Sequence, residues 1–153
     1  STPIEPTTER TEALAAAEEP ALATPAEHGT DGTVVRFAGL YGPGRYRIDR
    51  YLDGPVAPGY LSLLHRDDAA GAVAHLLREG LARDELVLAV DDEPVERGGL
   101  AEWLADRCGV EPPPEDSQRR PSKRCRNDKL RGLGYEFADS TFREGYAPAI
   151  ETR

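Results

Sequence analysis

Residues 34–45 (VVRFAGLYGPGR) combine residue types that could bind an anionic ligand. A run of apolar and β-branched residues carries Arg36, and it ends in Gly-Pro-Gly followed by Arg45. A glycine-rich turn lets the backbone approach a ligand closely, and a guanidinium forms paired hydrogen bonds to a carboxylate or phosphate. A buried Arg36 would need a carboxylate, a phosphate or several carbonyl acceptors beside it. A structural ion pair and an ordinary turn explain these residues equally well.

A second candidate site for an anion is the basic segment, residues 119–131 (RRPSKRCRNDKLR). It holds seven cations and one aspartate, a local charge of +6, so the formal net charge of -9 leaves -15 for the other positions. The segment can attract an anion, although a solvated cationic face is the simpler interpretation. The acidic remainder and the absence of interleaved aromatic residues argue against nucleic acid as a partner.

The histidines and cysteines form no recognised metal or redox motif. His28, His65 and His75 are scattered along the sequence, and Cys108 and Cys125 lack CxxC spacing. We therefore expect no metal site and two free thiols.

The length of 153 residues suits one acidic domain, with a sequence pI of about 4.9. No apolar run is long enough to cross a membrane, and no charged leader with an apolar core opens the chain. We expect no membrane partner and a cytoplasmic location. The absence of methionine suggests either an initiator removed before Ser1 or a part of a longer polypeptide.

Hydrophobic patterning predicts helices alternating with buried parallel strands, which is an α/β arrangement with right-handed crossovers. Strands are expected at 33–38 and 85–90. Two such strands are too few for a doubly wound sheet, so the sequence suggests the later part of a larger fold. A first helix is expected to begin at Thr7 or Thr8, and Pro20 should end or kink it. Further helices are expected over 46–53, from Asp67 or Asp68 to Gly80, over 97–108, over 127–134 and from Thr141. A brief extended segment is expected at 59–65 and a small strand at 135–137.

In this order, the elements resemble the C-terminal half of the extended short-chain dehydrogenase/reductase superfamily, nearest to its NAD-dependent epimerase/dehydratase proteins. Each motif is weak alone, but their order and spacing cover nearly all of the chain. The matching residues are Arg36, Tyr41, Gly42, Pro43 and Gly44 of an Arg-x-x-x-x-Tyr-Gly-Pro-Gly strand end, His65 and Asp68 of a His-x-x-Asp pair, Leu133 and Gly134 of a leucine-glycine pair, and Thr141 and Gly145 of a Thr-x-x-x-Gly helix start.

The resemblance implies the C-terminal part of a Rossmann-like doubly wound parallel sheet plus a small substrate-binding subdomain. Residues 1–153 would form one partial NAD(P)-binding domain, with later sheet strands and helices in 1–90 and substrate-side helices in 91–153. The implied cofactor is NAD or NADP, the implied partner a nucleotide-sugar-like small molecule, and the implied assembly a homodimer or a complex with a missing N-terminal half. The implied site residues are Phe37, Ala38 and Gly39 for the nicotinamide, and Tyr41, Gly42, Pro43, Gly44, Arg45, His65, Arg120 and Arg124 for the substrate, with the last two at its diphosphate.

Two family features are missing. The sequence has no GxxGxxG turn, which in the family holds the cofactor pyrophosphate, so the adenosine side of the cofactor site is absent. The family's catalytic tyrosine and the lysine four residues later are replaced by Arg10 and Leu14 when the first helix is aligned on Glu18.

Neither replacement can transfer the proton, so no catalytic residue is assigned. Three hypotheses remain open. The chain is the substrate-side half of an NAD(P)-dependent epimerase, dehydratase or reductase, a non-catalytic dinucleotide- or metabolite-binding sensor or interaction module, or a truncated product without independent function.

Overall fold

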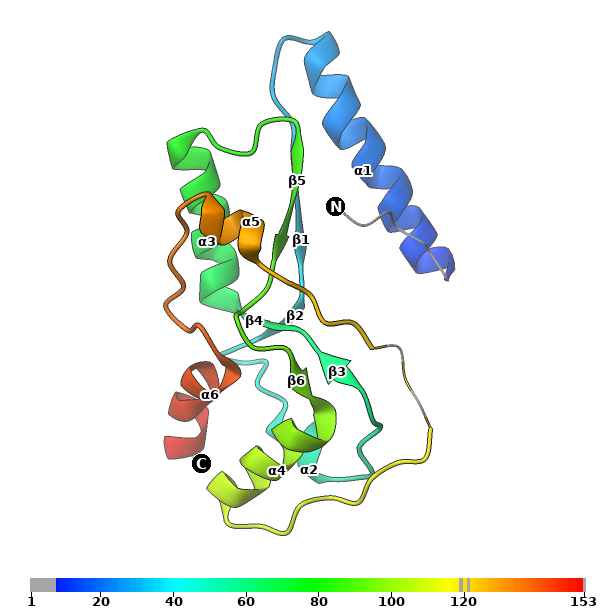
Figure 1. The fold of residues 1–153 in the computed structure, drawn as a ribbon, viewed down its shortest axis with the longest axis vertical. Coiled ribbons are helices and arrows are strands. Elements are labelled where there is room, and N and C mark those ends of the chain that lie inside the picture. The colour runs from blue at the N-terminus through cyan, green and yellow to red at the C-terminus, as the bar shows by residue number, and fades with distance from the viewer. Residues whose placement is uncertain (1–7, 119, 121, 153) are drawn as a thin grey trace.

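The computed structural model describes residues 8–118, 120 and 122–152. It confirms an α/β chain with parallel strand pairs (Figure 1). Its helices are α1 (Glu9–Glu27), α2 (Ile48–Leu52), α3 (Arg66–Glu79), α4 (Arg97–Cys108), α5 (Asp128–Gly132) and α6 (Phe142–Glu151), and its strands are β1 (Thr33–Phe37), β2 (Gly39–Tyr41), β3 (Tyr60–Leu61), β4 (Leu63–His65), β5 (Glu85–Ala89) and β6 (Val95–Glu96).

The two strands expected from apolar runs form a parallel pair. β1 and β5 run in register from Thr33 opposite Glu85 to Phe37 opposite Ala89. After one intervening residue the chain enters β2, which pairs in parallel with β4, so that Tyr41 lies opposite His65. A short antiparallel pair, β3 and β6, completes the strands of the described residues. The β1 side chains are only partly buried, less than the sequence predicted.

Two apolar clusters hold these layers together. In the first, α3 and α5 pack on β5 in the upper half of Figure 1, with Leu76, Val87 and Leu130 at its centre. In the second, α2, α4 and α6 lie below the short strands. Its central residues are Tyr41, Leu63, Leu100, Leu104, Phe142 and Tyr146. The site lies where the two clusters meet, at the carboxyl ends of β2 and β4.

Several helix ends follow from local sequence. Gly80 ends α3 and Gly109 ends α4, each with a positive φ that glycine adopts without steric cost, as predicted. Thr141 and Glu144 form the capping box that begins α6. The start of α3 was predicted wrongly: His65 is its N-cap, and the Asp68 carboxylate instead accepts hydrogen bonds from the distant backbone at residues 138 and 139.

The sequence predicted that Pro20 would end or kink the first helix. The helix does not end there but continues to Glu27. Proline removes the amide that would bond to the Ala16 carbonyl, but both residues are exposed, so water can solvate that carbonyl. The strand predicted at 135–137 is also absent. Tyr135 is held there by its own side chain, which donates to Asp68, and no strand pairs with this segment among the described residues.

Arg36 forms an ion pair, as the structural interpretation of residues 34–45 predicted. Its Nε and a terminal nitrogen donate to the two carboxylate oxygens of Glu18 at 2.7 and 2.5 Å. The hydrogen bonds from Arg36 hold the pKa of Glu18 below its usual value. This ion pair ties α1 to β1, and the rest of α1 is largely exposed (Figure 1).

None of the helices in the described part of the chain has the length and apolar character needed to cross a membrane.

Candidate functional site

A glycine loop, residues 42–45, follows β2 at the carboxyl end of the parallel pair. Gly42 and Gly44 have φ values of 137° and 75°, which favour glycine. A Cβ on Gly42 would lie 2.9 Å from His65 Nε2, so the backbone rests directly on the imidazole ring. Arg66 fixes the loop by donating to the Pro43 carbonyl at 2.8 Å. Pro43, Gly44 and Arg45 are exposed, so the loop presents backbone and one guanidinium to solvent.

Phe37, Ala38 and Gly39 link β1 to β2. The Phe37 side chain is 42% exposed, which is unusual for a large apolar residue at the end of a core strand. The amides of Ala38 and Gly39 donate to the carbonyls of Ala89 and Ser62, both at 3.0 Å. A ligand at this junction would therefore meet the Phe37 ring and the glycine surface rather than free amides.

Tyr41 lies in the core rather than at a solvent-facing edge. Its side chain is buried and stacks on Tyr146, with ring centroids 4.7 Å apart. A Cβ on Gly145 would lie 2.2 Å from the Tyr41 hydroxyl, so only glycine fits there. Burial is the main cause that raises the pKa of Tyr41, and the nearby Asp91 carboxylate adds to it. The phenol therefore stays neutral and supports the glycine loop from below.

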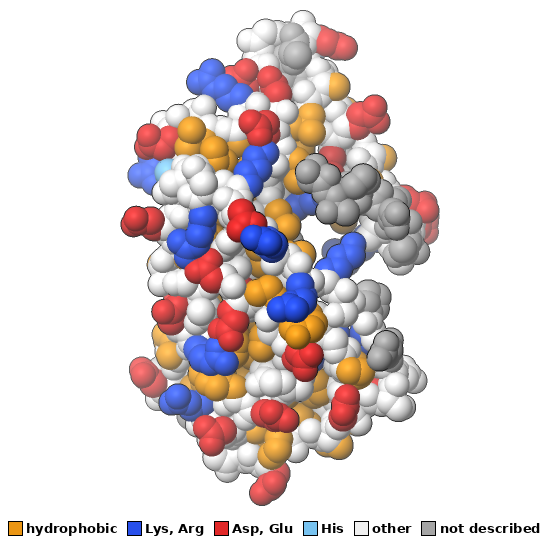
Figure 2. Space-filling model, in the orientation of Figure 1, with side chains coloured by type: hydrophobic (Ala, Val, Ile, Leu, Met, Phe, Trp, Pro, Cys, Tyr) orange, Lys and Arg blue, Asp and Glu red, His pale blue; other side chains and the backbone are white. Residues whose placement is uncertain are grey.

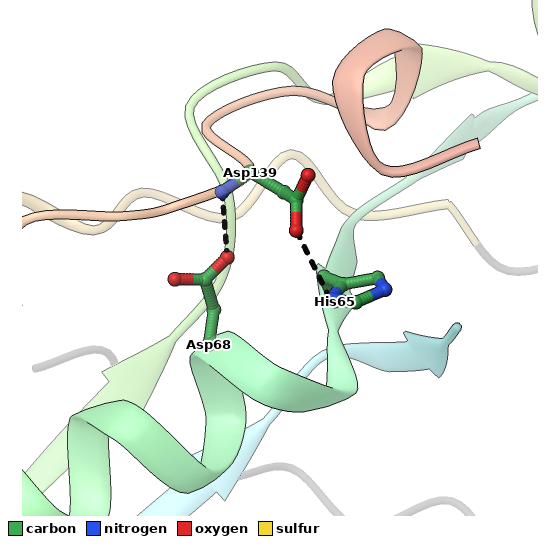
Figure 3. A group of neighbouring side chains, drawn as sticks. All are labelled: His65, Asp68 and Asp139. Atoms are coloured by element: carbon green, nitrogen blue, oxygen red, sulfur yellow. Dashed lines mark hydrogen bonds and ion pairs between the residues drawn. The ribbon is translucent and has the colours of Figure 1, made fainter. Parts of the chain in front are cut away.

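His65 is also buried, under the glycine loop, and belongs to a cluster of three side chains (Figure 3). Its Nδ1 lies 3.1 Å from Asp139 Oδ2. Asp68 completes the cluster, because its carboxylate accepts hydrogen bonds from the amides of Ala138 and Asp139 at 2.8 and 2.9 Å. The Tyr135 hydroxyl donates to the same carboxylate at 2.9 Å. We call His65, Asp68 and Asp139 the His-Asp-Asp cluster.

Neither Asp91, beside this cluster, nor Asp139, within it, was predicted as a site residue. Asp91 is 1% exposed, its Oδ2 has no hydrogen-bond partner among the described residues, and burial raises its pKa to about 8. Asp139 also has a raised pKa, mainly through burial and further through Asp68, while His65 lowers it. For Asp91 a signal was present, because an acid directly after a buried strand lies at the sheet edge where ligands bind.

The described residues of the basic segment run beside β3 and Ser62, where the Tyr60 amide donates to Ser122 Oγ at 2.6 Å. The Arg124 guanidinium lies 4.6 Å from the centroid of the Tyr60 ring, and Ser62 Oγ donates to the Lys123 carbonyl at 3.1 Å. Arg120 is exposed, whereas Arg119 lies outside the described residues. Figure 2 shows Lys and Arg side chains interspersed with Asp and Glu over the face of the molecule that it draws. Three cations of the segment have acidic partners, namely Arg126 with Asp128, Lys129 with Glu85 and Arg131 with Asp92.

The helix that the resemblance aligns with the catalytic tyrosine and lysine is α1, and its residues include neither type. Arg10 and Leu14 both lie on its exposed surface. The cysteines are free thiols, as expected.

No family model and no curated protein matches this chain. Solved structures do match it. A protein from Methylobacillus flagellatus, described as an NAD-dependent epimerase/dehydratase, is 28% identical with a TM-score of 0.81 over 99% of this chain and 56% of its own. A conserved protein of unknown function from Silicibacter pomeroyi is 25% identical with a TM-score of 0.82, over 99% of this chain and 58% of its own.

A dTDP-glucose 4,6-dehydratase from Bacillus anthracis, solved in complex with NAD, shares the fold at 17% identity. Its TM-score is 0.81, over 98% of this chain and 53% of the dehydratase. The resemblance to NAD-dependent epimerase/dehydratase chains and the Rossmann-like fold class are thereby confirmed. The chain spans little more than half the length of the solved structures that it matches.

Proposed function

We propose that this chain is the substrate-side half of an NAD(P)-dependent epimerase/dehydratase-like protein that binds a nucleotide sugar. The glycine loop is the observation that carries this proposal. It exposes backbone and Arg45 at the carboxyl ends of parallel strands, where open α/β sheets bind their ligands.

We assign each residue a proposed role according to whether its side chain is exposed or buried. Phe37, Ala38 and Gly39 would contact the nicotinamide, with the Phe37 ring as the apolar surface. Pro43, Gly44 and Arg45 would contact the sugar nucleotide. Tyr41, Gly42 and His65 would position the loop from below, because they are buried. Arg120 and Arg124 would bind the diphosphate, since both are exposed and guanidinium groups bind phosphate in paired hydrogen bonds.

The other half of the site would come from polypeptide that extends the sheet at β1. Among the described strands β1 pairs only with β5, and a two-stranded sheet is marginal alone. A groove between β1 and α3 includes the apolar Val35, Val73 and Leu77 beside polar residues, and Leu77 is 76% exposed. Residues 1–90 would then supply the later sheet elements, and residues 91–153 the substrate-side helices, of one shared domain.

A second candidate is a non-catalytic protein that binds a dinucleotide or metabolite. It is favoured by Arg10 and Leu14, since neither side chain can supply the proton transfer and pKa control of a tyrosine and lysine pair. Both candidates include the same ligand site, and a homodimer through the helices that flank the sheet suits either.

Titration of NADH and assay of turnover separate the candidates. The protein purified from its own cells should bind NADH and dTDP-glucose. Turnover of the nucleotide sugar with NAD or NADP would establish the enzyme, and tight binding of both without turnover would establish the non-catalytic protein. Failure to bind either ligand would contradict both candidates.

A further inference from the structure

The His-Asp-Asp cluster brings together three metal-ligating side chains from separate segments. His65 ends β4, Asp68 lies in the first turn of α3, and Asp139 precedes α6; the three side chains face one another (Figure 3). One possible ligand atom from each lies within 4.8 Å of the others. We propose that His65, Asp68 and Asp139 bind a first-row transition-metal dication such as Zn²⁺. This site is additional to the proposed function, which requires no metal.

The imidazole is the first observation that favours a cation. The His65 side chain is 6% exposed, and its Nδ1 has no hydrogen-bond partner among the described residues. A buried polar atom without such a partner is uncommon, because its desolvation is not compensated. Nδ1 is within ion-pair distance of Asp139 Oδ2 but does not have hydrogen-bond geometry towards it. A cation bound to both Nδ1 and Asp139 Oδ2 would compensate the desolvation of Nδ1 without a hydrogen bond between the two atoms.

The separation of these two atoms suits a shared metal. Ligand atoms about 2.0 to 2.1 Å from one metal lie about 2.9 Å apart at octahedral angles and about 3.4 Å apart at tetrahedral angles. The observed separation between His65 Nδ1 and Asp139 Oδ2 is 3.1 Å. Both atoms can therefore bind one ion with little movement of either side chain.

Asp68 retains capacity for a third bond. Its Oδ1 accepts from the Tyr135 hydroxyl and the Ala138 amide, whereas among the described residues its Oδ2 accepts only from the Asp139 amide. A carboxylate oxygen has two lone pairs, so one remains on Oδ2. Backbone and hydroxyl donors of this kind typically orient a metal-binding carboxylate. Asp139 is 25% exposed, which leaves a path for the ion from solvent.

The choice of ion follows from charge and ligand type. Asp67 Oδ2 and Asp139 Oδ2 lie 3.9 and 3.1 Å from His65 Nδ1, and Asp68 belongs to the same cluster, so carboxylates outnumber the imidazole and a dication would reduce the excess of negative charge. Imidazole favours zinc and its neighbours over magnesium or calcium, which take oxygen ligands. Three protein ligands would leave a fourth position for water.

The test is titration of Co²⁺, an optical probe, into the chelator-treated full chain, followed by displacement with Zn²⁺. We expect one equivalent to bind and affinity to fall at least 10-fold in His65→Ala and in Asp139→Asn. His75→Ala and Asp106→Asn are the matched controls, because neither residue belongs to the cluster and Asp106 is exposed on α4. Both should bind within about twofold of the wild type.

The proposal would be overturned if the wild type failed to bind one equivalent of Co²⁺, or if His65→Ala bound it with unchanged affinity. The contact between His65 and Asp139 would then be an ion pair only. Should the variants not fold, the ¹⁵N resonances of the wild-type histidines during Zn²⁺ addition give a separate test. The His65 Nδ1 resonance should shift while those of His75 stay in place. An unshifted His65 resonance would also overturn the site.

Discussion

At the residue scale, the glycine loop depends on buried side chains that the sequence marked as ligand contacts. Tyr41 and His65 were expected to line the substrate pocket, but both lie beneath the loop. Their distance along the chain from Tyr146 and Asp139 explains why sequence reasoning did not place them. A contact between residues more than 70 positions apart depends on tertiary packing, which local pattern does not encode. The exposure of Pro43, Gly44 and Arg45 agrees with their expected place at the rim.

Asp91 predicts an unusual dependence of stability on pH. Burial raises its pKa to about 8, so the folded state keeps this proton at pH values where the unfolded state has lost it. Its contribution to the free energy of unfolding is therefore present at low pH and is lost as pH rises towards 8. Asp91→Asn should reduce the loss of stability between pH 5 and pH 8 by up to about 4 kcal/mol, given about 1.4 kcal/mol per pH unit over these three units.

Urea unfolding of both proteins at pH 5 and pH 8 measures this difference. Equal losses of stability in wild type and Asp91→Asn would show that Asp91 is ionised in the folded protein throughout.

Gly145 predicts a steric effect on the core below the loop. An alanine Cβ would lie 2.2 Å from the Tyr41 hydroxyl and 2.8 Å from two ring atoms, so the stacked rings must move. Gly145→Ala should lower the free energy of unfolding by about 1 to 3 kcal/mol. Gly132→Ala is the control, since nothing lies within 4 Å of its Cβ, and its stability should stay near wild type. Chemical denaturation that finds the two variants equally stable would contradict the packing described here.

At the element scale, helices and strands with strong local signals were predictable, and segments fixed by distant partners were not. The apolar stripe of α3 and its terminal Gly80 were sufficient to predict that helix. The apolar runs of β1 and β5 were sufficient to predict two parallel strands, and the structure shows that they pair with each other. By contrast, residues 135–137 were predicted as a small strand, but the hydrogen bond from Tyr135 to Asp68 fixes them in an irregular conformation.

The attachment of α1 to β1 should depend strongly on one ion pair. Glu18→Gln keeps the side-chain shape but removes the charge that pairs with Arg36. Both side chains are partly exposed, so the loss in unfolding free energy should stay within about 1 kcal/mol. Amide exchange throughout α1 should nevertheless become faster, because few other contacts hold this helix. Glu19→Gln, an exposed neighbour, is the matched control. Unchanged exchange in Glu18→Gln would mean that other contacts anchor α1.

At the scale of the whole molecule, the sequence predicted the fold class and the likeness to the C-terminal half of longer proteins. Two core strands were too few for a complete doubly wound sheet, and the solved structures that match are nearly twice as long. From the sequence, the proposed ligand site could be predicted only as two separate parts, the glycine loop with Arg45 and the basic segment with Arg120 and Arg124. Binding of one ligand by both parts would depend on the polypeptide that would extend the sheet at β1.

The most direct test of the proposed substrate side is a calorimetric titration of dTDP-glucose into the protein purified from its own cells, in the presence of NAD. We expect saturable binding that Arg45→Ala weakens about 10-fold, since a guanidinium at the rim would lose paired hydrogen bonds to the ligand. Arg78→Ala, an exposed change on α3 away from the loop, should bind as the wild type does. Equal affinity in Arg45→Ala and wild type, or no binding at all, would contradict a nucleotide-sugar site at the glycine loop.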